Sequence, residues 1–114
     1  MDNNSTDSLS AVFAALGNPT RRAILARLAK GEATVYELSE PFGLTQPTIS
    51  RHLKVLEDAG LIEGMRDAQR RPRRLRLRAM KDAADWMEPF RELWARRLNN
   101  LDRYLARPPK DKEK

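Results

Sequence analysis

The chain has 114 residues, with 22 Lys and Arg against 16 Asp and Glu, a formal net charge of +6 and a mean hydropathy of −0.70. This length predicts one domain, and no apolar run approaches the ~18–20 residues that a membrane span needs. There is no cysteine and one histidine, His52, which excludes disulfides, thiolate nucleophiles and metal sites built from cysteines or several histidines. The N-terminal segment also lacks the pattern of a secretory signal, so we expect a small, soluble, cytoplasmic protein.

The first part of the chain predicts two helices. Asp7 or Ser8 is expected to cap the first, because either side chain can accept a backbone hydrogen bond, and Gly17 ends it. Asn18 followed by Pro19 predicts the cap and first position of the second helix. The apolar residues at helical spacing in these two helices are Leu9, Val12, Phe13, Leu16, Ile24, Leu25 and Leu28.

The middle of the chain predicts a helix-turn-helix. Thr34 and Glu37 fit the capping-box pattern at the start of a short third helix. Gly43 allows a tight turn after it, Thr45 caps the fourth helix, and Gly60 ends that helix. Two helices joined by a short turn that contains glycine are typical of DNA-binding helix-turn-helix units.

After the helix-turn-helix, the apolar period changes from helical to alternating. Leu75 and Leu77 alternate with arginines, which predicts a half-buried strand, and residues 61–66 are its expected partner. Residues 67–71 form the expected turn. Pro72 is expected at a strand start or on an edge, because it cannot donate to a ladder. The simplest assembly is a two-stranded β-wing.

This wing segment also holds most of the uncompensated positive charge. Only Glu63 and Asp67 oppose seven arginines in residues 61–78, which leaves the segment at +5. Guanidinium groups form paired hydrogen bonds with phosphate and stay protonated, so the segment is suited to a polyanion. The alternative is a charged hairpin that contacts only solvent. The seven arginines are Arg66, Arg70, Arg71, Arg73, Arg74, Arg76 and Arg78.

From Asp82 onward the helical period returns. One stripe of this last helix carries both tryptophans, and Pro89 either begins a new helix or kinks this one. The stripe and the first helix carry more apolar surface than a chain of this size readily covers, so we expect a two-fold dimer formed by the terminal helices. The alternative is that both pack on the chain's own core. The expected interface residues are Leu9, Phe13, Trp86, Phe90, Leu93, Trp94, Leu98 and Leu101.

Together these elements predict a mainly α fold with a two-stranded β-wing: a winged helix-turn-helix with N- and C-terminal dimerisation helices. Residues 8–106 are the expected DNA-binding domain, and residues 1–7 and 107–114 are expected to be disordered tails. The chain contains no internal repeat.

The fourth helix separates an apolar side from a polar side. At about 100° per residue, Ile49, Leu53 and Leu56 share the buried side. The opposite side and its flanks offer an amide, hydroxyls and two cations, with which a recognition helix meets base edges and phosphates. A merely solvated face is the alternative, and His52 is expected to be a packed helix residue or a phosphate contact. The expected DNA-binding residues of this helix are Gln46, Pro47, Thr48, Ser50, Arg51 and Lys54.

Two segments resemble the ArsR/SmtB-type family of bacterial winged-helix repressors: LGNPTRRAIL at residues 16–25 and TQPTISRHLKVLEDAGLI at residues 45–62. The resemblance covers roughly residues 9–105 and implies a homodimer that binds an operator until a signal releases it. The residues to which it assigns base reading are Gln46, Thr48, Ser50 and Arg51, and those to which it assigns wing contacts are Arg70, Arg71, Arg73 and Arg74.

The chain departs from the metal-sensing members of that family. Those members carry a cysteine pair inside the third helix, where this chain has Ser39 and Pro41. Other members bind zinc through acidic and histidine ligands on the last helix, whereas residues 82–106 contain no histidine, and carboxylates alone make a poor zinc site. The C-terminal segment WMEPFRELWARRLNNLDRYL resembles that of a metal-independent branch, so we expect no metal and no other cofactor.

We therefore interpret the chain as a dimeric, sequence-specific repressor that binds a double-stranded DNA operator. The alternative is a nucleoid-associated protein that binds DNA without reading its sequence; a repressor prefers its site by roughly 10³ or more. An enzyme is disfavoured, because no nucleophile–base pair and no phosphate-binding glycine loop stands out. An adaptor without DNA binding would not present Arg51 and Lys54. The sequence leaves open the operator, the regulated genes, transcriptional activation and any small-molecule inducer.

Overall fold

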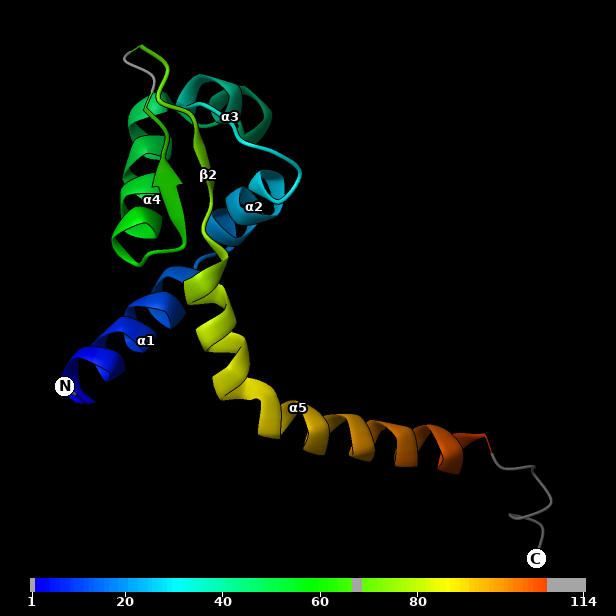
Figure 1. The fold of residues 1–114 in the computed structure, drawn as a ribbon. Coiled ribbons are helices and arrows are strands. Elements are labelled where there is room, and N and C mark those ends of the chain that lie inside the picture. Colours follow the sequence, from blue (N-terminus) through cyan, green and yellow to red (C-terminus); the bar gives the residue numbers. More distant parts are fainter. Residues whose placement is uncertain (1, 67–68, 107–114) are drawn as a thin grey trace, which may run out of the picture. The chain divides into compact units, whose positions relative to one another are not determined.

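The computed structural model describes residues 2–66 and 69–106, with side chains from Ser8 onward (Figure 1). Within that part of the chain it contains five helices and a two-stranded antiparallel sheet, which confirms the mainly α fold with a β-wing. The elements in chain order are α1 (Asp2–Leu16), α2 (Pro19–Leu28), α3 (Val35–Phe42), α4 (Gln46–Asp58), β1 (Ile62–Gly64), β2 (Arg73–Leu75) and α5 (Leu77–Leu105). Among the described helices, none is long and apolar enough to cross a membrane.

The contacts within the chain define two units. The first extends through Ala83 and contains α1 to α4, the sheet and the first turns of α5. The second begins at Ala84 and contains the rest of α5. The helix-turn-helix and the wing therefore belong to one unit, and the C-terminal apolar stripe belongs to the other.

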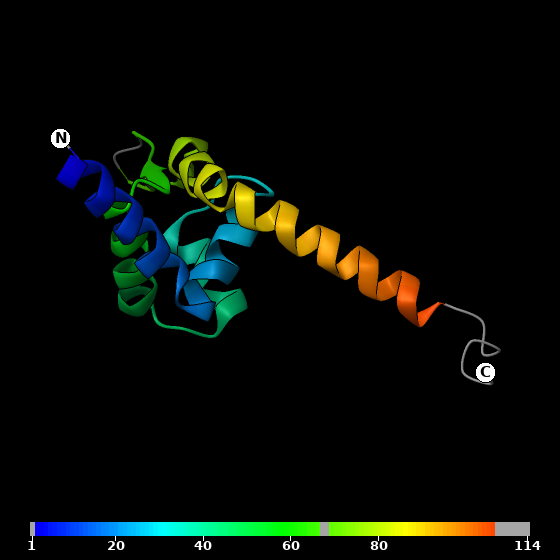
Figure 2. The same cartoon turned by 90° about the horizontal axis from the view of Figure 1, so that it is seen from below.

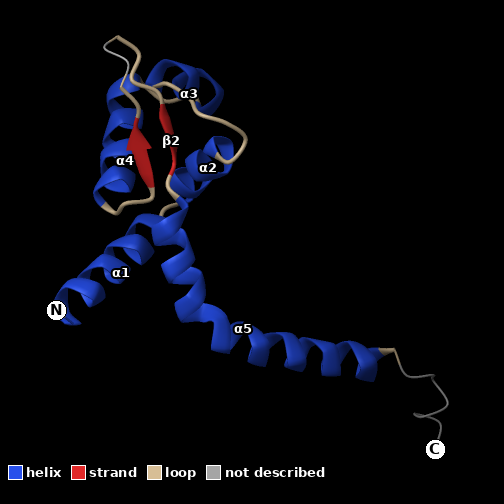
Figure 3. Cartoon of the chain, in the orientation of Figure 1, coloured by secondary structure: helices blue, strands red, loops and turns tan. Residues whose placement is uncertain are grey.

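α4 is the central helix of the first unit. It packs against α1, α2, α3 and β1 (Figure 2). Ile49, Leu53 and Leu56 of α4 are fully buried, as the helical period predicts. β1 packs on α4 and β2 packs on α2, so the sheet lies between these two helices (Figure 3). The other core residues are Val12, Ala15, Ile24, Leu25, Leu28, Ala33, Leu38, Leu61, Ile62 and Ala83.

Three predicted helix caps are confirmed. Asn18 caps α2, and Pro19 follows it in the first turn. At α3, Thr34 Oγ1 accepts a hydrogen bond from the Glu37 N–H at 3.1 Å, and the Thr34 N–H donates to Glu37 Oε1 at 2.9 Å. Thr45 caps α4 in a similar way. These bonds satisfy N–H groups that the first turn of a helix leaves without a helical partner.

The N-terminal helix is longer than predicted. α1 begins at Asp2, so residues 2–7 are helical where we expected a disordered tail, and Asp7 and Ser8 lie inside the helix. Polar residues of this kind can continue a helix whose later turns are anchored by packing, here through the buried Val12. The tail expected at residues 107–114 lies outside the described residues.

The wing strands are shorter than predicted. β1 pairs antiparallel with β2, with Gly64 opposite Arg73. β2 ends at Leu75, and Leu77 begins α5 with its side chain 67% exposed. The prediction of a strand through Leu77 is therefore wrong, because alternation alone does not separate the end of a strand from the start of a helix. The expected turn includes residues 67–68, which lie outside the described part of the chain.

The second unit is a helical segment with a largely exposed apolar stripe. α5 continues through Pro89, so Pro89 does not begin a new helix. The rings of Trp86 and Phe90 lie 5.2 Å apart between centroids. The large apolar side chains of the stripe are 41–69% exposed in the single chain. This segment therefore presents the apolar surface from which the sequence predicted a dimer.

Candidate nucleic-acid interface

α4 presents a polar surface opposite its buried side. Pro47 is accommodated there because it lies in the first turn, where no helical hydrogen bond needs its missing N–H. Thr48 Oγ1 accepts a hydrogen bond from Thr45 Oγ1 at 3.0 Å, so the Thr48 hydroxyl also supports the cap of the helix. The residues that were predicted to contact DNA from this helix are exposed Gln46, Pro47, Ser50, Arg51 and Lys54, and half-buried Thr48.

A glycine makes the turn between α3 and α4. Gly43 has a φ of +65°, in the left-handed region that other residues rarely adopt. The Leu44 N–H donates to the carbonyl of Ser39 at 3.2 Å, which satisfies a carbonyl at the end of α3. The two helices pack on each other with Leu38 and Ile49 fully buried. They form the predicted helix-turn-helix, in which α4 is the second helix and keeps one side exposed.

Lys54 is accessible although it has a partner. Its Nζ lies 3.2 Å from Asp58 Oδ1, and the two side chains are 72% and 63% exposed. Ion pairs as exposed as this one contribute little to stability. A phosphate can therefore replace Asp58 as the partner of Lys54. Arg51 is exposed three positions earlier, so α4 carries two cations in successive turns.

His52 belongs to the packing between helices rather than to the exposed face. Its Nδ1 lies 3.5 Å from Arg21 Nη1, and Arg21 also donates from Nε to the carbonyl of Ala15 at 2.8 Å. Burial lowers the pKa of His52, and the charges of Arg21 and Arg51 lower it further. Of the two alternatives, a packed residue fits better than a phosphate contact. Across the described residues, no three His, Asp or Glu side chains gather into a group that could hold a metal ion.

Two of the predicted wing residues contact Glu57: Arg73 turns inward, whereas Arg71 stays 53% exposed. Glu57 Oε2 on α4 accepts from Arg73 Nε at 3.0 Å and from Arg71 Nη1 at 3.4 Å. The Arg73 side chain is only 13% exposed, so Arg73 is a structural ion-pair partner rather than the solvent-facing wing residue that we expected. Sequence reasoning missed Glu57, and no local pattern identifies it, because its partners lie 14 and 16 positions later.

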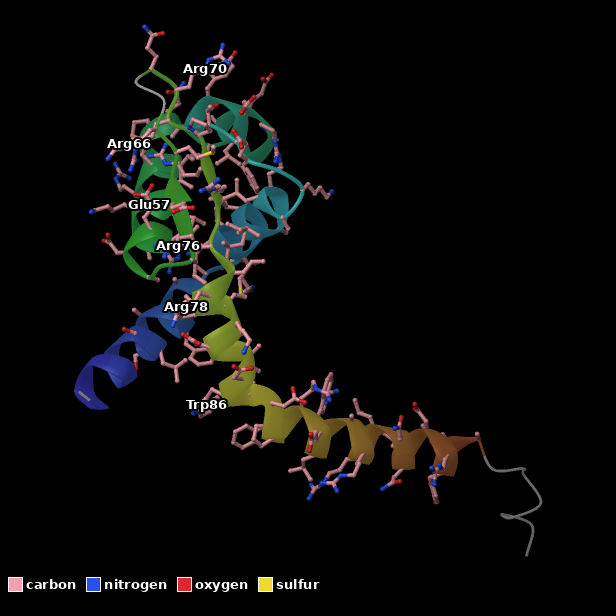
Figure 4. The ribbon with its side chains drawn as sticks, in the orientation of Figure 1. Glu57, Arg66, Arg70, Arg76, Arg78 and Trp86 are labelled. Carbon is pink, nitrogen blue, oxygen red and sulfur yellow. The ribbon has the colours of Figure 1, made fainter. Side chains whose placement is uncertain are left out.

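Other arginines of the wing remain on its surface. Arg66 and Arg70 lie at the end of the wing and are exposed (Figure 4). Arg74 Nε donates to Glu63 Oε2 at 2.7 Å, yet the Arg74 side chain stays 55% exposed. The predicted wing residues that the structure leaves accessible to a polyanion are therefore Arg70, Arg71 and Arg74, and Arg66 joins them.

The wing and the helix-turn-helix line one open groove. Its volume is about 600 Å³. Gln46 and Ser50 of α4 line one part of it and Arg70 of the wing lines another, so predicted residues from both elements share one surface. The start of α3 contributes residues that the sequence did not suggest, including the exposed Tyr36. The full lining is Thr34, Val35, Tyr36, Glu37, Gln46, Ser50, Gln69 and Arg70.

A helix-turn-helix with an exposed polar helix, followed by an arginine-rich two-stranded wing, defines a winged helix-turn-helix DNA-binding protein. Comparison with known families gives the same class: residues 18–63 match the family described as bacterial regulatory protein, arsR family. This match runs from the cap of α2 into β1. The chain belongs to the arsR family and is a DNA-binding transcriptional regulator.

Similar proteins extend over more of the chain than the family match does. The transcriptional repressor SdpR of Bacillus subtilis (strain 168) is 37% identical over 79 residues, which are 69% of this chain and 88% of SdpR. A crystal structure of an ArsR family transcriptional regulator is 36% identical, with a TM-score of 0.70 over 79% of this chain and 93% of that chain. The solution structure of a homodimeric winged helix-turn-helix DNA-binding domain from Mycobacterium bovis, a possible ArsR-family regulator, is 28% identical, with a TM-score of 0.64 over 87% and 89% of the two chains.

Proposed function

We propose that the chain is a homodimeric, sequence-specific repressor of transcription that needs no metal. One observation carries the proposal: α4 buries Ile49, Leu53 and Leu56 completely, while the same helix exposes an amide, a hydroxyl and an arginine on its other side. A helix held in this way can present these groups to base edges in the major groove. The proposal includes no catalytic activity, since the relatives are transcriptional regulators.

In this proposal the first turns of α4 read the bases. Arg51 suits guanine and Gln46 suits adenine, because each can form two hydrogen bonds with that base. Ser50 and Thr48 bind bases or phosphates through their hydroxyls. Pro47 lies between Gln46 and Thr48 and contributes shape rather than hydrogen bonds. The phosphate contacts come from exposed cations, namely Lys54, Arg66, Arg70 and Arg74.

The dimer is proposed to form through α5, with a contribution from α1. The stripe on α5 leaves Trp86, Phe90 and Trp94 more than half exposed in the single chain, an unusual amount of aromatic surface for a soluble helix. Leu9 and Phe13 of α1 are half-buried against the core of the first unit, and we propose their exposed parts as a second dimer contact. The homodimeric state of the M. bovis domain supports a homodimer here.

Independence from metal is proposed from the chemistry of the available side chains. The chain has no cysteine, and its one histidine is half-buried beside Arg21. Carboxylates alone bind zinc poorly compared with thiolates and imidazoles. Release of DNA is therefore assigned to a signal other than a thiophilic metal.

Selection of bound duplexes from a random DNA pool tests the proposal. We expect a pseudo-palindromic site whose half-sites lie about one or two helical turns apart, preferred over random DNA by roughly 10³ or more at physiological salt. Enrichment of no sequence would contradict a repressor and favour a nucleoid-associated protein. A single unpaired half-site, together with a monomer mass in solution, would contradict the dimer.

A further inference from the structure

We propose that Glu57 is a positioning residue that fixes the wing on α4, so that base contacts and wing contacts are made by one rigid unit. The inference rests on the proposed DNA-binding function and concerns how strongly the protein prefers its own site to other DNA. Glu57 follows Arg51 by about 9 Å along the axis of α4, at ~1.5 Å per residue. It acts through the arginines that it holds and does not itself contact DNA.

The ion pair between Glu57 and Arg73 joins α4 to β2. The two side chains are 20% and 13% exposed, and Arg73 Nε lies 3.0 Å from Glu57 Oε2. Salt screens a pair at this depth much less than it screens a surface pair, and loss of one partner leaves the other charge partly buried. The Arg74–Glu63 pair on the same wing is different, because its side chains are 55% and 37% exposed.

Arg73 also forms hydrogen bonds with the backbone of neighbouring segments. Its N–H donates to the carbonyl of Ala33 at 2.8 Å, and its own carbonyl accepts from the Ala33 N–H at 3.0 Å. On the other side, Arg73 stands opposite Gly64 in the sheet. Its Nη1 also donates to the carbonyl of Arg71 at 2.9 Å. One side chain and its backbone therefore connect α4, the segment before α3 and the loop of the wing.

Arg71 reaches Glu57 across a glycine. The φ of Arg71 is +42°, an uncommon backbone conformation for a residue with a side chain. A Cβ atom on Gly64 would lie 2.5 Å from Arg71 Cζ and 2.6 Å from Nη2, so the guanidinium occupies the space that glycine leaves open. The contact of Arg71 with Glu57 thus depends on Gly64, whereas the contact of Arg73 does not.

Three single substitutions separate positioning from general stabilisation. Glu57→Gln keeps the shape of the side chain and removes the charge that holds both arginines. Gly64→Ala displaces the flexible end of Arg71 and leaves the Glu57–Arg73 pair in place. Glu63→Gln is the matched control, because it removes the same charge from an exposed pair of the wing that does not involve α4.

The measurement is the dissociation constant for the selected operator and for a random duplex of equal length, over a series of salt concentrations. Thermal unfolding of each variant establishes that it is folded. Residues in one contact network are strongly coupled. We therefore expect Glu57→Gln to lower the ratio of operator affinity to random-DNA affinity about 10-fold, and Gly64→Ala to lower it about 3-fold. Glu63→Gln is expected to leave the preference unchanged and to strengthen binding to both duplexes alike, as removal of one negative charge should.

An unchanged preference in Glu57→Gln overturns the proposal, and so does an equal loss of preference in Glu63→Gln. If Glu57→Gln does not fold, Gly64→Ala decides the question: a lowered preference supports positioning and a wild-type preference overturns it. If the wild-type protein prefers no sequence, the proposed function itself fails and this inference falls with it. The two failures are distinguished by the wild-type measurement alone.

Discussion

The exposed stripe of α5 predicts that dimer formation depends strongly on single side chains, and Trp94 provides a measurable case. Trp94 is 62% exposed in the single chain. Because an enclosed tryptophan buries ~150–250 Å², about 100–150 Å² of Trp94 remains for a partner to cover. At ~25 cal/mol per Å², covering half of that area contributes about 1.5 kcal/mol per chain. Each residue occurs twice in a two-fold dimer, so Trp94→Ala is expected to cost about 3 kcal/mol and to weaken the dimer roughly 100-fold.

Sedimentation equilibrium over a wide concentration range measures this change directly. Tyr36→Ala is the matched control, because Tyr36 is an aromatic residue of the helix-turn-helix with a similar exposure of 68%. We expect Tyr36→Ala to leave the dimer constant unchanged. Equal weakening of the dimer by the two variants would contradict a dimer interface at Trp94, and so would a wild-type protein that is a monomer at tens of micromolar.

Four further predictions follow from the interface and its surroundings. Arg51→Ala should cost about 1–3 kcal/mol of operator binding and relax the base preference at one position per half-site. Arg70→Ala should instead weaken binding to all sequences and reduce the slope of log affinity against log salt by about 1 for each phosphate that is no longer neutralised. Binding to operator and random DNA across a salt series distinguishes the two effects. Arg73→Ala should lower the free energy of unfolding by about 1–3 kcal/mol, because it leaves Glu57 partly buried without its closest arginine. Arg74→Ala should change the free energy of unfolding by less than about 1 kcal/mol. Urea unfolding checks both values. Zinc, cadmium or arsenite should not change operator affinity, and a stoichiometric effect in a binding titration would contradict independence from metal. Burial lowers the pKa of His52 below its ordinary 6.5, so the unfolded state takes up the proton first as the pH falls and the folded state loses stability. His52→Gln should remove this part of the loss of stability between about pH 7 and pH 5, which thermal unfolding at each pH measures.

How much of the structure the sequence predicts depends on how local each interaction is. The caps by Asn18, Thr34 and Thr45 could be predicted, because each side chain bonds to a backbone N–H three residues later. The buried side of α4 follows equally from its period of apolar residues. The inward turn of Arg73 could not be predicted, because it depends on a carboxylate 16 residues earlier and on the packing of β1 and β2 against neighbouring helices. A charge pattern indicates which segment attracts a polyanion, but not which of its arginines forms an ion pair with a nearby carboxylate and turns inward.

The central position of α4 has a consequence for the entropy of binding. Because α4 packs on α1, α2, α3 and β1 through three fully buried side chains, its backbone cannot open without disrupting most of the first unit. Its amide protons should therefore exchange with solvent slowly, close to the limit that global unfolding sets. Its exposed side chains stand on a backbone that is ordered before DNA arrives. Only side-chain rotamers of α4 remain to be ordered on binding, at a cost of about 0.5–1.5 kcal/mol for each side chain immobilised. Differences in affinity between DNA sequences should therefore reflect the contacts made rather than folding of α4.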